Sequence, residues 1–150
     1  ATDVSALISH DDTERVKSWI DEAVDAGAKV EVGGEVDGSL LQPTVLSNAT
    51  ADMKVCRDEV FGPVVAIQAY DALDDALALA NDTRYGLNAM VFTRDLSRAH
   101  RASAALRAGT VWVNCFFVRD LRAPFGGVGD SASAARAAPS AASSSPSPRP

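Results

Sequence analysis

Strand-like and helix-like segments alternate regularly between residues 64 and 114, and this alternation constrains the fold more than any other feature of the sequence. Three runs are typical of strands: VVAIQAY at 64–70, NAMVFT at 88–93 and TVWVN at 110–114. The stretches between them space their apolar residues as one helix face does. Helical crossovers of this length favour parallel pairing of the strands they connect. The sequence therefore predicts an α/β fold, a parallel β-α-β-α-β sheet with flanking helices.

The second of these helices is predicted from about Asp95 to Ala108, with Gly109 ending it. Its predicted inner face consists of Leu96, Ala99, Ser103 and Leu106. The first helix is predicted over DALDDALALAN, at 71–81.

The segment before this alternation predicts one more helix and two short strands. Ser9 or Asp11 is placed to cap a helix that ends at Gly27. Its apolar residues at helical spacing are Val16, Trp19, Ile20, Ala23 and Val24. Runs at Lys29–Val32 and Leu40–Leu46 are typical of strands, because turn-forming glycines and aspartates separate them.

The composition changes abruptly after Ser131 to alanine, serine and proline. We therefore expect residues 1–131 to form one domain and residues 132–150 to be a low-complexity, disordered tail, because the tail has no large apolar residue to bury. The chain also begins without an initiator methionine on a turn-like segment, which is typical of a piece of a longer protein.

The net charge and the composition restrict the kinds of partner that the chain can bind. Residues 1–131 contain 12 Lys and Arg against 20 Asp and Glu, a net charge of −8, which argues against a nucleic acid partner. No apolar run reaches the roughly 18 residues of a membrane span, and no signal peptide is evident, so we expect no membrane partner and a cytoplasmic location. Cys56 and Cys115 lie far apart, which predicts neither a zinc site nor a disulfide framework.

Three longer motifs follow one another in a recognisable order: QPTVLSNATADMKVCRDEVFGPVVAI at 42–67, LANDTRYGLNAMVFTRDLSRAH at 79–100 and GTVWVNCFFVRDLRAPFGGV at 109–128. Together they resemble the aldehyde dehydrogenase superfamily over nearly all of residues 1–131, as the C-terminal part of its catalytic domain. In that family a cysteine thiolate attacks the aldehyde, hydride passes to NAD or NADP, and water hydrolyses the thioester. Neither cysteine of this chain matches the nucleophile motif, so the resemblance implies a fragment without catalytic residues that is inactive alone.

The resemblance assigns a cofactor contact to the DEVFGPV stretch. It implies that Glu59 accepts hydrogen bonds from the ribose hydroxyls on the nicotinamide side, and that Phe61 packs against the nicotinamide or its ribose. The alternative is structural: a turn that leads into a strand, with a buried phenylalanine and a solvated glutamate.

The third motif is implied to line the substrate tunnel, with apolar walls from Cys115, Phe116, Phe117 and Phe125. Arg119 and Arg122 stand out in such a lining, because an arginine fork binds a carboxylate through two hydrogen bonds. VRDLRAPFGG resembles the subgroup that oxidises 2-hydroxymuconate and 5-carboxymethyl-2-hydroxymuconate semialdehydes in aromatic catabolism. For both arginines a structural salt bridge, for instance with Asp120, remains open.

The tail departs from the family pattern, which continues with a segment close to GIGREGG where this chain has ASAARAA at 132–138. GIGREGG written in GC-rich codons yields ASAARAA when read one base out of frame. We therefore expect a frameshifted tail, and the loss of a terminal segment that the resemblance implies in subunit assembly.

Two further functions stay open. Within the family, the alternative is a betaine-aldehyde or general aliphatic aldehyde dehydrogenase, and the full-length enzyme is expected to be a homo-oligomer. Outside it, the chain is a non-catalytic acidic interaction module.

Overall fold

The computed structural model describes residues 4–118, 120, 122 and 125–132. The chain divides into two compact units, Ala1–Ala76 and Leu77–Pro150, and each is considered by itself. Almost all of the predicted tail, from Ser133 onward, lies outside the described residues, and so does Arg119.

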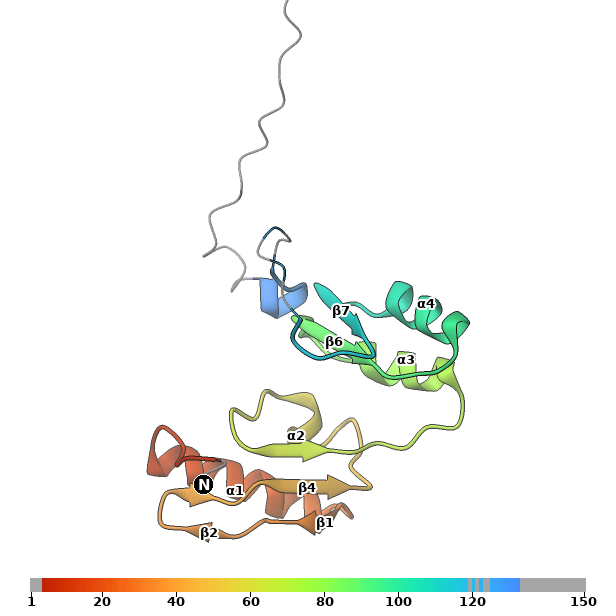
Figure 1. The fold of residues 1–150 in the computed structure, drawn as a ribbon. Coiled ribbons are helices and arrows are strands. Elements are labelled where there is room, and N and C mark those ends of the chain that lie inside the picture. The colour runs from red at the N-terminus through yellow and green to blue at the C-terminus, as the bar shows by residue number, and fades with distance from the viewer. Residues whose placement is uncertain (1–3, 119, 121, 123–124, 133–150) are drawn as a thin grey trace, which may run out of the picture. The chain divides into compact units, whose positions relative to one another are not determined.

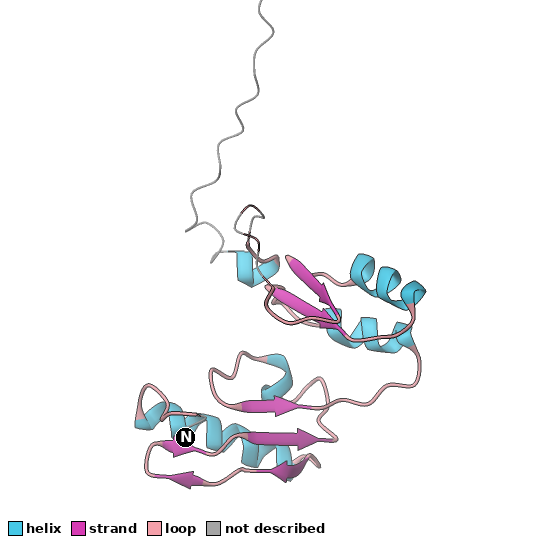
Figure 2. Ribbon diagram, in the orientation of Figure 1, coloured by secondary structure: helices cyan, strands magenta, loops and turns pink. Residues whose placement is uncertain are grey.

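The first unit contains most of the elements. In chain order they are α1 (His10–Asp25), β1 (Lys29–Val32), β2 (Val36–Asp37), β3 (Leu40–Leu41), β4 (Thr44–Ser47), α2 (Lys54–Arg57) and β5 (Val64–Ala66) (Figures 1 and 2). β1, β4 and β5 form a three-stranded sheet in that order, and β2 and β3 form a separate antiparallel pair.

Helix α1 begins where the sequence predicts. The Ser9 hydroxyl accepts a hydrogen bond from the backbone N–H of Asp12, as an N-cap does. Its buried face packs into the core of the unit, against apolar side chains of the strands and α2. Members of this core are Val16, Ile20, Ala23, Ala28, Leu41, Leu46, Ala49, Met53 and Val55. Of the predicted helix face, Val24 is 40% exposed.

The predicted strand at Leu40–Leu46 is interrupted, because β3 ends at Leu41 and β4 begins at Thr44. Pro43 lies in this interruption and has no N–H for a ladder hydrogen bond. β4 pairs with β1 in antiparallel and with β5 in parallel. Val45 is in register with Val32 on one side and with Val65 on the other, while the neighbouring Leu46 is buried in the core.

The second unit is built on a parallel pair of strands, β6 (Asn88–Val91) and β7 (Thr110–Val113). The connecting helix α4 (Leu96–Ala105) contacts both strands, and α3 (Leu73–Asn81) precedes them across the boundary between the units. A short 3-10 helix, η1 (Gly129–Ser131), follows.

Helix α4 is shorter than predicted, and its predicted inner face is confirmed in part: Ala99 is buried, Ser103 and Leu106 are half-buried, and Leu96 is exposed. The helix is capped by Asp95, as expected, but Leu106 is already extended, so Ala105 and not Ala108 is its last residue. The buried residues are Ala99 and Ala102, whereas Leu96 is 72% exposed. Gly109 does not end the helix. It lies beside the carbonyl oxygen of Gly126, which any added Cβ would strike.

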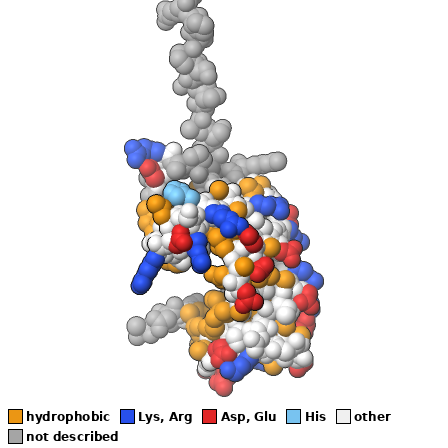
Figure 3. Space-filling view, turned by 90° about the vertical axis from the view of Figure 1, so that its right-hand side faces the viewer, with side chains coloured by type: hydrophobic (Ala, Val, Ile, Leu, Met, Phe, Trp, Pro, Cys, Tyr) orange, Lys and Arg blue, Asp and Glu red, His pale blue; other side chains and the backbone are white. Residues whose placement is uncertain are grey.

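The predicted α/β class, with parallel strands and flanking helices, is confirmed. The strands predicted at 64–70, 88–93 and 110–114 do not share one sheet, however, because β5 pairs in parallel with β4, whereas β6 and β7 form a separate parallel pair. No helix among the described residues is long and apolar enough to span a membrane. Apolar side chains are also exposed on the surface, where they lie among acidic and basic ones (Figure 3).

Candidate functional site

The candidate cofactor segment lies between α2 and β5. Glu59 is exposed, and the Phe61 side chain is 76% exposed with its backbone in the left-handed region at φ 48°. A non-glycine residue is uncommon there, and the cost is on the order of 1–2 kcal/mol. The structural alternative predicted that the Phe61 side chain is buried, and that prediction is wrong. The ring is exposed at the surface of the unit.

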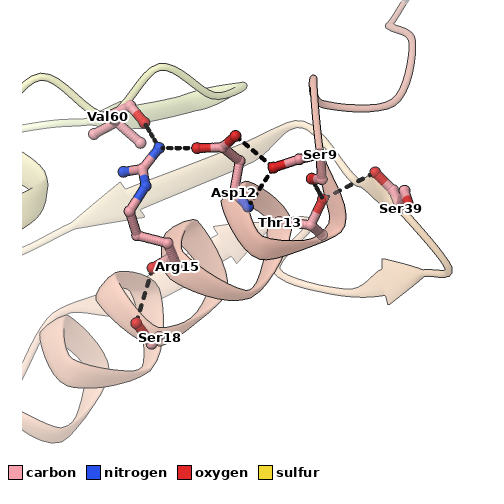
Figure 4. A network of polar contacts seen from close by, with 7 residues as sticks. All are labelled: Ser9, Asp12, Thr13, Arg15, Ser18, Ser39 and Val60. Atoms are coloured by element: carbon pink, nitrogen blue, oxygen red, sulfur yellow. Dashed lines mark hydrogen bonds and ion pairs between the residues drawn. The ribbon is translucent and has the colours of Figure 1, made fainter.

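The surrounding backbone holds this segment on both sides. On one side the Pro63 carbonyl accepts a hydrogen bond of 2.8 Å from the Thr44 N–H, and the Gly62 carbonyl accepts one from Val64. On the other side the Val60 carbonyl accepts a hydrogen bond of 3.1 Å from Nη2 of Arg15 on α1 (Figure 4). The exposed Glu59 and Phe61 thus lie on a backbone that is anchored by the rest of the unit.

The candidate substrate segment leaves β7 through Asn114, whose backbone is left-handed at φ 54°. Its side-chain amide exchanges two hydrogen bonds with the backbone of Thr93, at 2.8 and 2.9 Å. Asparagine tolerates this conformation better than other side chains. The chain is therefore turned at a defined point, directly before Cys115.

An aromatic cluster follows this turn. Trp112 lies 6.4 Å from Phe116 and 5.9 Å from Phe117 between ring centroids, and the two phenylalanines lie 5.6 Å apart. The indole N–H of Trp112 donates to the Val118 carbonyl at 2.9 Å. Both phenylalanines remain at least half exposed, and the backbone of Phe117 is left-handed at φ 56°. The segment presents aromatic surface, as a substrate wall requires.

Arg122 of this segment has a defined salt-bridge partner. Arg122 forms a salt bridge of 2.7 Å with Asp120, which also lowers the pKa of that carboxyl through hydrogen bonds from Arg122. The side chain of Arg122 is nevertheless 90% exposed. Arg119 lies outside the described residues. Phe125 is 36% exposed.

The end of the candidate substrate segment is fastened to the turn before β6. The Gly86 carbonyl accepts hydrogen bonds from the N–H groups of Gly109 and Val128, and the Gly86 N–H donates to the Ser131 hydroxyl. Arg84 pairs with Asp130 at 3.4 Å. These contacts give the turn that contains Gly86 a structural role.

The surroundings of Cys56 do not favour a thiolate. Burial, followed by the negative charge of Asp52, raises the pKa of the Cys56 thiol, which is the opposite of what a nucleophilic thiolate needs. Cys115 is a free, half-buried thiol. Within the described part of the chain, no group of three or more His, Cys, Asp or Glu side chains gathers as a metal site would.

Two features of the site were not predicted from the sequence. Arg15 contacts Val60 across 45 residues, and no local pattern announces such a contact. A pocket of about 490 Å³ lies at the carboxyl ends of β6 and β7, lined by Phe92, Thr93, Arg94 and Asn114. The rule that ligands bind at carboxyl ends of parallel strands was the available signal.

Known proteins resemble the chain in sequence. A 3-sulfolactaldehyde dehydrogenase of Priestia aryabhattai is 46% identical over 128 residues, which cover 85% of this chain and 27% of the relative. A 2-aminomuconic 6-semialdehyde dehydrogenase of a Pseudomonas species is 41% identical, over 85% of this chain and 28% of the relative. The chain therefore spans about a quarter of the length of these relatives.

Solved structures resemble it in fold. The betaine aldehyde dehydrogenase of Staphylococcus aureus, in complex with NAD+, superimposes with a TM-score of 0.80 and 36% identity, over 87% of this chain and 27% of the other. The family model of the aldehyde dehydrogenase family matches residues 1–144. The predicted resemblance is thereby confirmed at the level of the family, and the chain belongs to the aldehyde dehydrogenase family.

Proposed function

We propose that the chain is the C-terminal part of an NAD(P)-dependent aldehyde dehydrogenase and supplies one wall of its cofactor and substrate site. The observation that carries this proposal is the conformation of Phe61, which is left-handed and 76% exposed on an anchored backbone. Such strain persists where the surrounding structure holds the backbone in place, and it collects at functional sites.

In this proposal Glu59 and Phe61 hold the nicotinamide side of the cofactor. A carboxylate offers two acceptor oxygens to the two hydroxyls of a ribose, and an exposed aromatic ring offers a flat apolar surface. NAD(P)+ supplies the hydride acceptor of the reaction. The similar Staphylococcus aureus enzyme was solved in complex with NAD+, which supports this cofactor class, while the choice between NAD and NADP stays open.

The nucleophile and the general base are proposed to lie outside this chain. The raised pKa of Cys56 supports this, because a thiol that is harder to ionise attacks an aldehyde poorly. We therefore expect the 150-residue chain to reduce no NAD+ with any aldehyde, and the full-length polypeptide to do so.

The proposed substrate is an aldehyde that carries an acidic group, in particular a carboxylated semialdehyde of aromatic catabolism. Arg119 and Arg122 would supply cations to the segment that presents Phe117 and Phe125. The Priestia and Pseudomonas relatives, a sulfolactaldehyde and an aminomuconic semialdehyde dehydrogenase, are consistent with an acidic substrate. The likeness to a betaine aldehyde dehydrogenase supports the second candidate, a betaine-aldehyde or general aliphatic aldehyde dehydrogenase.

Steady-state kinetics of the full-length enzyme separates these substrates. Arg119→Ala and Arg122→Ala are compared with the parent on a hydroxymuconate-type semialdehyde, on betaine aldehyde and on a neutral aliphatic aldehyde. We expect one of the two substitutions to raise KM for the semialdehyde about tenfold, the equivalent of one charge-assisted hydrogen bond, without changing KM for the neutral aldehyde.

An unchanged KM for the semialdehyde in both variants excludes the arginines from substrate binding. A kcat/KM that is highest for betaine aldehyde establishes the second candidate instead.

A further inference from the structure

Helix α1 reaches the candidate cofactor segment through one side chain. Nη2 of Arg15 donates to the Val60 carbonyl at 3.1 Å, across 45 residues of sequence. Val60 stands between Glu59 and Phe61, the two residues that the proposed function assigns to the cofactor. The carbonyl that Arg15 holds is therefore part of the same short piece of backbone.

Arg15 is itself held in place. The same Nη2 atom lies 3.2 Å from Oδ1 of Asp12, and the guanidinium lies 4.9 Å from the centroid of the Trp19 ring. The Arg15 and Asp12 side chains are each only 33% exposed. A long side chain that is already held at two points, by Asp12 and by the Trp19 ring, has less rotamer freedom left to lose when it binds a carbonyl.

The partner of Arg15 is fixed as well. The Ser9 hydroxyl donates to Oδ2 of Asp12 at 2.6 Å and accepts from its backbone N–H at 3.1 Å (Figure 4). The hydrogen bond from Ser9, and then that from Arg15, lowers the pKa of the Asp12 carboxyl and so favours its charged form. The N-terminal turn of α1 thus forms one polar network that ends on Val60.

A second contact brings the segment close to the same helix. A Cβ on Gly62 would lie 3.2 Å from one methyl group of Val16 and 3.3 Å from the other. The backbone at Gly62 therefore rests directly on α1, one helical residue after Arg15. The hydrogen bond at Val60 and the close approach at Gly62 thus hold the backbone on both sides of Phe61.

We propose that Arg15 is a positioning residue, which sets the backbone of Glu59 to Phe61 for cofactor binding; this inference rests on the proposed function. The Val60 carbonyl and the Phe61 N–H belong to one planar peptide group. φ of Phe61 is the rotation about its N–Cα bond relative to that plane, so the Arg15 contact holds one side of this rotation while the backbone contacts of Gly62 and Pro63 hold the other, at the observed value of 48°. Arg15 does not touch the cofactor in this proposal.

The first experiment measures the position of the segment in the 150-residue chain. Arg15→Gln is compared with the parent by NMR, through the carbonyl carbon shift of Val60 and the 15N relaxation of residues 59–62. Lys17→Gln is the matched control, because Lys17 lies on the same helix and pairs with Asp21. We expect Arg15→Gln to shift the Val60 carbonyl and raise the mobility of residues 59–62, and Lys17→Gln to do neither.

The second experiment measures cofactor binding in the full-length enzyme. We expect Arg15→Gln to raise KM for NAD+ about tenfold and to leave KM for the aldehyde unchanged, as loss of a charge-assisted hydrogen bond at a remote anchor predicts. Gly62→Ala, which keeps Arg15 but pushes against Val16, is expected to raise KM for NAD+ as well. This second variant carries the test if Arg15→Gln folds poorly.

The outcomes separate the two proposals. If Glu59→Gln raises KM for NAD+ while Arg15→Gln and Gly62→Ala do not, the positioning role is overturned and the cofactor contact stands. If none of the three variants changes KM for NAD+, the cofactor contact itself is wrong. An Arg15→Gln chain with an unchanged Val60 carbonyl shift also overturns the positioning role.

Discussion

At the scale of single residues, Phe61 combines a costly backbone conformation with an exposed ring. Its φ of 48° lies where glycine is free and other residues meet a steric cost. Because the ring is 76% exposed, truncating it removes little buried surface. A substitution that relieves the backbone strain at Phe61 is therefore expected to raise the stability of the chain and to weaken its function.

The prediction for Phe61→Gly follows directly. Relief of the steric cost, less the greater freedom of glycine in the unfolded chain, is expected to stabilise the 150-residue chain by up to about 1 kcal/mol. In the full-length enzyme the same substitution is expected to raise KM for NAD+. Urea unfolding measures the first effect and steady-state kinetics the second.

Asn48→Gly is the matched control, because Asn48 is also left-handed, at φ 55°, and lies outside the DEVFGPV stretch. It is expected to leave KM for NAD+ unchanged. A Phe61→Gly chain that is destabilised by more than about 1 kcal/mol would show that the ring packs within the chain.

Sequence reasoning predicts a cofactor role for Glu59 and Phe61 because both belong to the contiguous DEVFGPV motif. It did not find Arg15, whose partner is 45 residues away and is a backbone carbonyl, a group that every residue carries. It also placed the alternative for Phe61 in the interior, since an aromatic residue before a strand is ordinarily buried. The left-handed backbone and the exposure of this ring depend on the tertiary structure and cannot be read from the local sequence.

At the scale of elements, the end of α4 shows why helix boundaries are hard to predict. Asn81, at the end of α3, donates to the Ala105 carbonyl at 2.9 Å and accepts from the Arg107 N–H at 2.8 Å. This side chain takes up the backbone groups that a longer α4 would use internally. Periodicity continues to Ala108, but an amide 26 residues upstream ends the helix at Ala105.

Removal of this amide is therefore expected to destabilise α4. Asn81→Ala should lower the free energy of unfolding by about 1–2 kcal/mol, because two hydrogen bonds are lost. Asn81→Asp keeps an acceptor for Arg107 and loses the donor to Ala105, so an intermediate loss is expected. Urea unfolding gives both values, and equal stability of the parent and Asn81→Ala would contradict the role.

The strands show the same limit. The pattern found β1, β5, β6 and β7, because alternation and β-branched residues are local signals. It merged β3 with β4, since the apolar letters run on around Pro43. The four-residue helix α2 and the two-residue strand β2 are too short to show any period.

At the scale of the whole molecule, helix α1 of the first unit leaves one face of the β1-β4-β5 sheet uncovered. Val32, Val45 and Val65 are in register across β1, β4 and β5, and the first and last of them are each 60% exposed. The adjacent residues of β4 and β5, Leu46 and Val64, pack into the core instead. Exposed valines on a sheet face favour self-association.

Val65→Ser is accordingly expected to reduce self-association of the 150-residue chain, measured by sedimentation velocity, without lowering its melting temperature. Val64→Ser is the matched control on the same strand. Because Val64 packs against the core, its substitution should lower the melting temperature and raise self-association. Equal behaviour of the two variants would show that the exposed valines have no such effect.

The indole of Trp112 also provides a fluorescence signal. The sequence contains two tryptophans, Trp19 and Trp112, so Trp19→Phe leaves a single fluorophore. That fluorophore is hydrogen-bonded to the Val118 carbonyl and lies beside the rings of Phe116 and Phe117. Its emission is therefore a built-in optical signal from the candidate substrate segment, readable in the protein without any added label.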